Sequence, residues 1–474
     1  MNNVQVLPLI IVIIYMIGML LIGYLTNKYV IKDSTDYMLA GRRMGLFMVA
    51  SSLSANNIGG GSTTGVAAKA FSGWGLSAAW YVLAAAIAMI PLAYFAPKIR
   101  KTLAVTIPEV VTRRFGNSAG ILTALLNVIS LFCLTASQIL ASGTVVSALT
   151  GLPLNVCILL AGIVVIAYTT MGGMLADAIT DVVQYLIIFF GLLIALPFII
   201  NGAGGWAAIS AKLPAAEFNI TKVGIVTIIG LILNYFITFL SGPEMVSRFS
   251  SAADEKTAQK ASVLSAAMMA ALAFIPTLIG LVALAENPGL NDGKGTTALM
   301  YATTNYAPGF ITGLVAAAIV AATMSSADSN LLCASTIIIK DLYQKYFNPK
   351  VSDKKLIFLT RACNVTICLI SIGIALFKVS LVTLNLFAFA LRSAGPFAAY
   401  ALGLTVKRAT KNSGIVSIII GSVAVLYWQI IGAPYGILPI IFGSFFGIAS
   451  FFIVTWIETM MGKPAAPSAF LDEK

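Results

Sequence analysis

The sequence contains no histidine and few charged residues, and each shortage excludes a class of function. Only 10% of its 474 residues are charged, whereas soluble domains carry about 25%. Without histidine, the chain lacks the commonest metal ligand and the side chain that titrates most readily near neutral pH. The composition therefore excludes an ordinary soluble domain and argues against a histidine-based metal or acid–base centre.

The cysteines give no sign of a disulfide framework or a metal site. All five fall inside apolar stretches, and their spacing matches no metal-binding or redox motif. They are Cys133, Cys157, Cys333, Cys363 and Cys368. We interpret them as small buried hydrophobic residues. No nucleophile–base set is visible elsewhere in the sequence, so we do not expect an enzyme.

Apolar residues, in contrast, are abundant. They make up 59% of the chain, and the mean hydropathy is +0.96. A membrane-spanning helix needs about 20 mostly apolar residues, and we predict thirteen such helices. The predicted spans cover roughly residues 5–26, 44–70, 74–97, 118–147, 153–171, 173–200, 223–242, 259–285, 308–338, 356–377, 380–405, 413–432 and 436–459. We therefore expect an all-α membrane protein, in which residues 1–474 form one transmembrane domain and residues 460–474 a cytoplasmic tail.

The first apolar run and the basic residues predict how the chain lies in the membrane. The run from Val6 to about Leu25 is too long for the core of a cleavable signal, so we interpret it as a span. The net charge is +12, and most Lys and Arg residues fall in alternate loops. By the positive-inside rule, this asymmetry places the N-terminus outside and the C-terminus in the cytoplasm. The basic residues thus predict how the chain is oriented in the lipid bilayer, and we expect that bilayer to be a cell inner membrane. It does not indicate a nucleic-acid partner, and no obligate protein partner is evident.

The second predicted span contains a polar, glycine-rich stretch. Residues 51–64 include the consecutive glycines Gly59, Gly60 and Gly61 among hydroxyl and amide side chains. A helix broken there would leave backbone groups unpaired, which is tolerated only where they line a cavity enclosed by protein. The alternative is close helix packing through small residues. Three adjacent glycines do not match that spacing, so we predict a broken helix.

The ninth predicted span carries a stripe of hydroxyl groups. On a helix, Ala322, Ser325, Ser326 and Ser329 fall within an arc of about 100°, with Asp328 at its edge. Hydroxyl and carbonyl oxygens are hard donors that suit an alkali cation. The stripe therefore predicts a cation site, unless the serines only mediate a contact between helices.

Two charged residues are expected deep in the membrane. Asp181 lies about 12 Å inside the sixth span at 1.5 Å per residue, and acids at such depth are candidates for functional sites. Arg392 lies near the middle of the eleventh span. It would either bind a carboxylate of the solute or neutralise Asp328 or Asp181.

Together these segments resemble the sodium/solute symporter family, which includes carriers of proline, pantothenate, sialic acid and galactose. The matching motifs are Asp36-Tyr37-Met38-Leu39-Ala40-Gly41-Arg42, Thr106-Ile107-Pro108-Glu109, Arg114-Phe115-Gly116, Tyr168-Thr169-Thr170-Met171-Gly172-Gly173-Met174, Thr180-Asp181-Val182-Val183-Gln184, Met324-Ser325-Ser326-Ala327-Asp328-Ser329 and Lys407-Arg408-Ala409-Thr410. The resemblance implies a leucine-transporter-type fold with thirteen spans and two inverted five-helix repeats. The repeats would cover residues 44–200 and 223–405, followed by two extra helices at 413–459.

The resemblance also implies where sodium binds. Its ligands would be the backbone carbonyls of Ala55, Ile58 and Ala322 and the hydroxyls of Ser325 and Ser326. Some family members hold a second ion, or pass sodium inward, at positions that match Asp181, Ser325, Asp328 and Ser329. Asp328 departs from members with serine at its position, so it could make such a site more acidic or pair with a basic residue and hold no ion.

The solute is predicted only by class. The third span lacks the acid that sugar carriers use, and the fourth lacks the arginine of sialic acid carriers, so neither substrate is supported. Residues expected near the solute are Asn57, Gly59, Gly60, Gly61, Ser62, Gln138, Asn234, Tyr235, Thr238, Phe239 and Arg392. Glycine N–H groups at a half-helix end suit a carboxylate, so we predict sodium-coupled symport of an amino acid or short organic acid by alternating access. A proton-coupled or sodium-independent carrier, or a transporter-like sensor, is the alternative.

Overall fold

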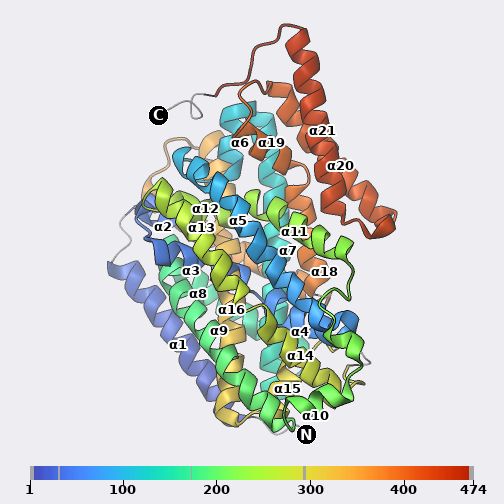
Figure 1. The fold of residues 1–474 in the computed structure, drawn as a ribbon. Coiled ribbons are helices and arrows are strands. Elements are labelled where there is room, and N and C mark those ends of the chain that lie inside the picture. The colour runs from blue at the N-terminus through green and yellow to red at the C-terminus, as the bar shows by residue number, and fades with distance from the viewer. Residues whose placement is uncertain (1–4, 30–32, 172, 292–294, 380, 469–474) are drawn as a thin grey trace.

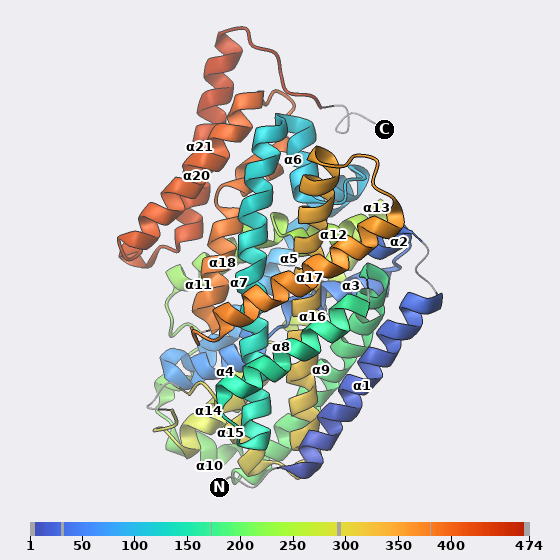
Figure 2. The ribbon, with the colours of Figure 1, turned by 180° about the vertical axis from the view of Figure 1, so that it is seen from behind.

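The computed structural model describes residues 5–29, 33–171, 173–291, 295–379 and 381–468, and within these ranges the chain is helical, with no β-strand. Figures 1 and 2 show the helices packed into one bundle. In the first half of the chain they are α1 (Val6–Tyr29), α2 (Ser34–Leu39), α3 (Leu46–Asn57), α4 (Val66–Lys69), α5 (Trp80–Lys101), α6 (Ile107–Phe115), α7 (Asn117–Thr150), α8 (Leu154–Met171), α9 (Met174–Gly202) and α10 (Trp206–Lys212). In the second half they are α11 (Ile225–Leu240), α12 (Pro243–Ser251), α13 (Glu255–Ala270), α14 (Phe274–Glu286), α15 (Ala298–Tyr306), α16 (Gly309–Thr336), α17 (Asp353–Ala375), α18 (Leu381–Ser393), α19 (Pro396–Gly403), α20 (Lys411–Ile430) and α21 (Pro439–Met460).

The helices confirm an all-α membrane protein but not the number of spans. Nine helical segments of the described residues are long and apolar enough to cross a membrane, or eleven if two bent pairs each count as one span. The predicted second and fifth spans fall outside this count, because α3 is short and ends at a break and because the apolar stretch counted in α8, Leu154–Ala167, is also short. Thirteen spans therefore remain a prediction.

Helix α16 forms the axis of the bundle. In the most apolar 18-residue stretch of the segment that contains α16, 89% of the residues are buried. The corresponding share for α1, at the edge of the bundle, is 28%. The sequence of α16 is rich in alanine and serine, and small side chains let neighbouring helices approach closely. Helices α7 and α9 pack along it, and α8 and α17 cross obliquely over α7 (Figure 2). The serine stripe on α16 is thus enclosed by protein on all sides.

The break predicted in the second span is confirmed. Helix α3 ends at Asn57, Ile58 leaves the helical conformation, and a wide turn over Gly61–Gly65 leads into α4. A Cβ atom on Gly59 would lie 2.7 Å from Gln138 Oε1 and 2.8 Å from Ser326 Oγ. The glycines therefore serve both purposes considered above, because they interrupt the helix and let it approach α7 and α16.

Two further helices are broken at Gly-Pro pairs. Helices α11 and α12 meet at 56° beside Gly242-Pro243, and α18 and α19 meet at 54° beside Gly395-Pro396. Proline cannot donate a backbone hydrogen bond and clashes with the preceding turn. The seventh span was expected to end at residue 242 and to be followed by a loop, but the residues after it are helical. The chain instead continues as α12, in which every residue is buried.

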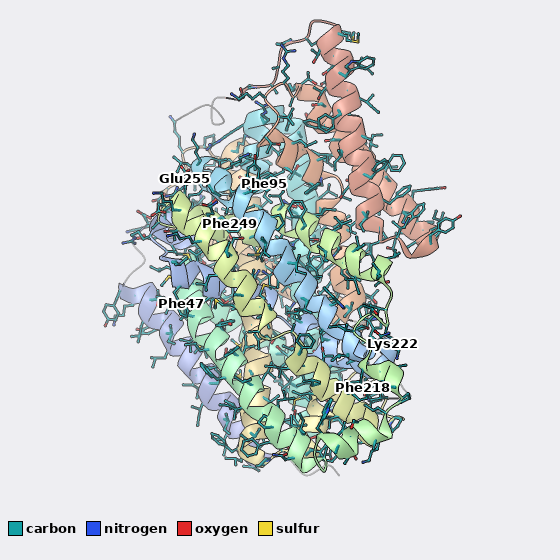
Figure 3. All side chains as sticks on the ribbon, in the orientation of Figure 1. Phe47, Phe95, Phe218, Lys222, Phe249 and Glu255 are labelled. Carbon is teal, nitrogen blue, oxygen red and sulfur yellow. The ribbon has the colours of Figure 1, made fainter. Side chains whose placement is uncertain are left out.

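The remaining helices flank this core. The pair α20 and α21 packs against itself and along α18 and α19 on one side of the bundle (Figures 1 and 2). Figure 3 shows Glu255, at the start of α13, toward the upper left of the molecule, and Lys222, just before α11, on its right flank.

Candidate functional site

The end of α3 and the middle of α16 meet through two serine hydroxyls. Ser325 Oγ donates a hydrogen bond to the carbonyl oxygen of Ala55 at 2.8 Å, and Ser326 Oγ donates one to Asn56 at 2.7 Å. Both hydroxyls also lie within 3.2 Å of the Ala322 carbonyl oxygen. The last carbonyls of a helix have no partner within it, so their oxygens are available to ligands from α16.

This contact brings four of the five predicted sodium ligands together. Ala55, Ala322, Ser325 and Ser326 are all buried, and Ile58 lies at the break directly after α3. A hydroxyl that donates its proton keeps lone pairs for a cation. The arrangement can therefore present several neutral oxygens to a small cation in a site shielded from water.

A small cavity lies beside the two serines. It encloses about 430 Å³, including the open part of its mouth. Six residues predicted near the solute line it: Asn57, Gly59, Gly61, Ser62, Gln138 and Tyr235. Gly60 lies behind the wall, where its N–H donates to Gln138 Oε1 at 2.9 Å. Asn234, Thr238, Phe239 and Arg392 are buried but are not among the cavity's lining residues.

The cavity also has lining residues that were not predicted near the solute, although Ser326 among them was predicted as a sodium ligand. They are Asn56, Tyr81, Leu134, Glu244, Ser326, Asn330, Asn385 and Phe389. Tyr81 and Phe389 pack with the predicted Tyr235, whose ring lies edge-on to Tyr81 with centroids 5.5 Å apart and lies 6.2 Å from Phe389. The cavity thus combines an aromatic wall with amide, hydroxyl and carboxylate groups.

Arg392 forms an ion pair, but with a partner that was not expected. Its two terminal nitrogens each lie 2.6 Å from one oxygen of Glu244, and both side chains are buried. The ion-pair partner of Arg392 is therefore Glu244, and Asp181 pairs with Arg248 instead. Glu244 was not predicted because the predicted seventh span stopped one residue before Pro243. The residues that form α12 were therefore expected to lie in a loop.

A second buried charge cluster surrounds Arg248 of α12, whose side chain is 0% exposed. Its Nη2 lies 3.0 Å from Asp181 Oδ2 and 3.1 Å from Asp177 Oδ2. Its Nε donates to Ser52 Oγ at 2.7 Å, and the Ser52 hydroxyl in turn donates to Asp181. Nη2 also donates to Ser329 Oγ at 2.5 Å. One guanidinium thereby connects α3, α9, α12 and α16.

Of the four residues predicted for a second cation or a sodium route, two contact Arg248 directly. Asp181 and Ser329 contact Arg248, whereas Asp328 accepts a hydrogen bond from the Ser329 N–H at 2.8 Å. Asp177 and Arg248 were missed, although the sequence held a signal. Asp177 and Asp181, like Glu244 and Arg248, are four residues apart and so share a helix face.

Comparison with known proteins identifies the family. The family model described as "Sodium:solute symporter family" matches residues 37–421. The chain belongs to the sodium:solute symporter family. It is 30% identical to the high-affinity proline transporter PutP of Bacillus subtilis (strain 168), over 96% of this chain and 98% of that protein. It is 29% identical to the sodium/proline symporter of Haemophilus influenzae, over 88% and 87% of the two chains.

Solved structures agree with this assignment. A sodium-coupled sialic acid symporter superimposes with a TM-score of 0.79 at 22% identity, covering 97% of this chain and 99% of that one. MhsT in complex with L-phenylalanine gives a TM-score of 0.55 at 14% identity, covering 87% and 97%. The leucine-transporter-type fold of these neighbours is the predicted one. The symporter is therefore a sodium-coupled membrane transporter of a small solute and not an enzyme.

Proposed function

We propose that this symporter imports a small amino acid, or a short carboxylate of similar size, together with sodium. The observation that carries the proposal is the contact between the serine hydroxyls of α16 and the terminal carbonyls of α3, beside the polar cavity. The solute class is supported by the proline transporters among its relatives. The N-terminus would lie outside a bacterial inner membrane and the C-terminus inside.

The proposed sodium ligands are the carbonyls of Ala55, Ile58 and Ala322 and the hydroxyls of Ser325 and Ser326. The ion would replace the hydrogen bonds that now join α3 to α16 and hold the two helices at a fixed distance. Since α3 ends in the glycine break that lines the cavity, this would also shape the solute site. Sodium and solute would then favour the same conformation, which is the requirement for coupling.

We propose that Asp181, Asp328 and Ser329 line the route by which sodium leaves, and that they do not hold a second ion tightly. Arg248 already contacts Asp181, Asp177 and Ser329. A cation entering this cluster would have to displace the guanidinium from its hydrogen bonds. The cluster would therefore attract sodium after its release without competing with the main site.

Uptake by purified symporter in proteoliposomes tests the proposal. A panel of radiolabelled amino acids and short carboxylates is offered under an inward sodium gradient, an inward proton gradient, or neither. We expect at least one amino acid or short carboxylate to accumulate with the sodium gradient alone. Accumulation driven equally well by the proton gradient without sodium would show proton coupling and contradict the proposal.

A further inference from the structure

We propose that Glu244 recognises a protonated amine on the solute, so that the symporter selects solutes bearing an ammonium group over those that carry only a carboxylate. This inference rests on the proposed function and narrows the solute class of the same cavity. It assigns Glu244 as a specificity-determining residue and Arg392 as the residue that positions it.

Glu244 brings negative charge to the cavity. Of the described residues that line the cavity, it alone carries a charge, and it is only 4% exposed. Arg392 approaches each carboxylate oxygen once. A carboxylate offers about four lone-pair positions, so both oxygens can still accept hydrogen bonds from a solute in the cavity.

A second acceptor lies in the same cavity. Asn56 is 8% exposed, and its side-chain oxygen has no hydrogen-bond partner among the described residues. Buried amide oxygens are normally hydrogen-bonded. A carboxylate and a free amide oxygen in one small cavity suit a group that carries several N–H donors and a positive charge, which describes an ammonium.

Arg392 contacts Glu244 from outside the cavity. It is absent from the cavity's lining, and its guanidinium lies 5.2 Å from the ring of Phe389, which does line the cavity. Charge on a buried carboxylate is unstable without a partner. Arg392 therefore balances the charge of Glu244 and fixes its direction. Of the two roles that the sequence left open for Arg392, this is the neutralising one, with Glu244 in place of Asp328 or Asp181.

Binding of matched probe pairs to the wild-type protein tests the inference directly. The pairs are L-proline with cyclopentanecarboxylate and L-alanine with propionate, each differing mainly in the amine. Dissociation constants are measured by thermal shift of the purified protein in saturating sodium. Sites built to hydrogen-bond a polar group reject analogues that lack it strongly, so we expect at least about 100-fold preference for an amino acid. Equal binding within a pair, or binding of carboxylates but no amino acid, overturns the inference.

Two double variants separate recognition from a structural role of the ion pair. In E244Q/R392Q both charges are removed together, and we expect the preference for the amine to fall below about tenfold while sodium still raises the melting temperature. In E244D/R392K the charges are kept, and we expect most of the preference to return. Unchanged preference in E244Q/R392Q would show that the pair only joins α12 to α18. If amine preference is found without any effect of sodium, the proposed function fails while this inference stands.

Discussion

Replacing Arg248 with methionine should lower the free energy of unfolding by about 3–5 kcal/mol. The side chain is fully buried between Asp177 and Asp181 and also donates hydrogen bonds to Ser52 and Ser329. Methionine fills a similar volume but leaves two carboxylates without a cation in a region shielded from water. The cost arises from those carboxylates more than from the lost hydrogen bonds themselves.

The origin of that cost can be measured in a double-mutant cycle. Adding Asp181→Asn to R248M removes one of the stranded charges, so the double variant should recover about 2 kcal/mol relative to R248M alone. Urea unfolding in detergent, followed by tryptophan fluorescence, gives the four free energies. Lys212, which pairs with Glu286 at the surface, supplies the control, since Lys212→Met should cost under about 1 kcal/mol. The reasoning is refuted if R248M costs no more than the control or if D181N adds to its cost.

Three further predictions concern the glycine break after α3, the sodium route proposed at Asp328 and the N-terminal cap of α13. Gly59→Ala should lower stability by about 1–3 kcal/mol, measured by urea unfolding, because a Cβ there meets Gln138 and Ser326; Gly18→Ala, where nothing lies within 4 Å, is its control. Asp328→Asn should slow sodium-driven exchange with little change in sodium affinity, measured by ²²Na⁺ counterflow, and a large loss of affinity would argue for a second bound ion. The Asp254 carboxylate accepts the N–H of Thr257 at 2.7 Å, which lowers its pKa. Its stabilisation is therefore present above the unfolded pKa of about 3.9 and is lost as pH falls through the folded pKa, so the melting temperatures of D254A and wild type should differ at pH 7 and converge near pH 2.

The sequence predicted the features that depend on local pattern. Three adjacent glycines located the break after α3, and the spacing of Ser325 and Ser326 located the face of α16 that meets it. Both signals are short and need only helix geometry. The burial of the stripe and its partners, Ala55 and Asn56, could not be predicted from local pattern. They depend on how α3 packs against α16, which brings together residues 270 positions apart in the sequence.

The buried ion pairs were not predictable in the same way. Arg392 was recognised as a buried charge, but its partner Glu244 lies on another broken helix, 148 residues away. No local pattern specifies which acid an arginine will meet across a bundle. Arg248 was missed, as Glu244 was, because the predicted seventh span ended at residue 242 and the residues that form α12 were assigned to a loop.

Direct binding of ²²Na⁺ to the purified symporter tests the central claim most closely. In S325A and S326A the proposed site loses one hydroxyl ligand each, and the dissociation constant for sodium should rise at least about tenfold. S335A removes a buried serine of the same helix whose hydroxyl donates a hydrogen bond to the nearby Leu332 carbonyl, and it should bind sodium as the wild type does. Equal sodium affinity in all four proteins would contradict the account.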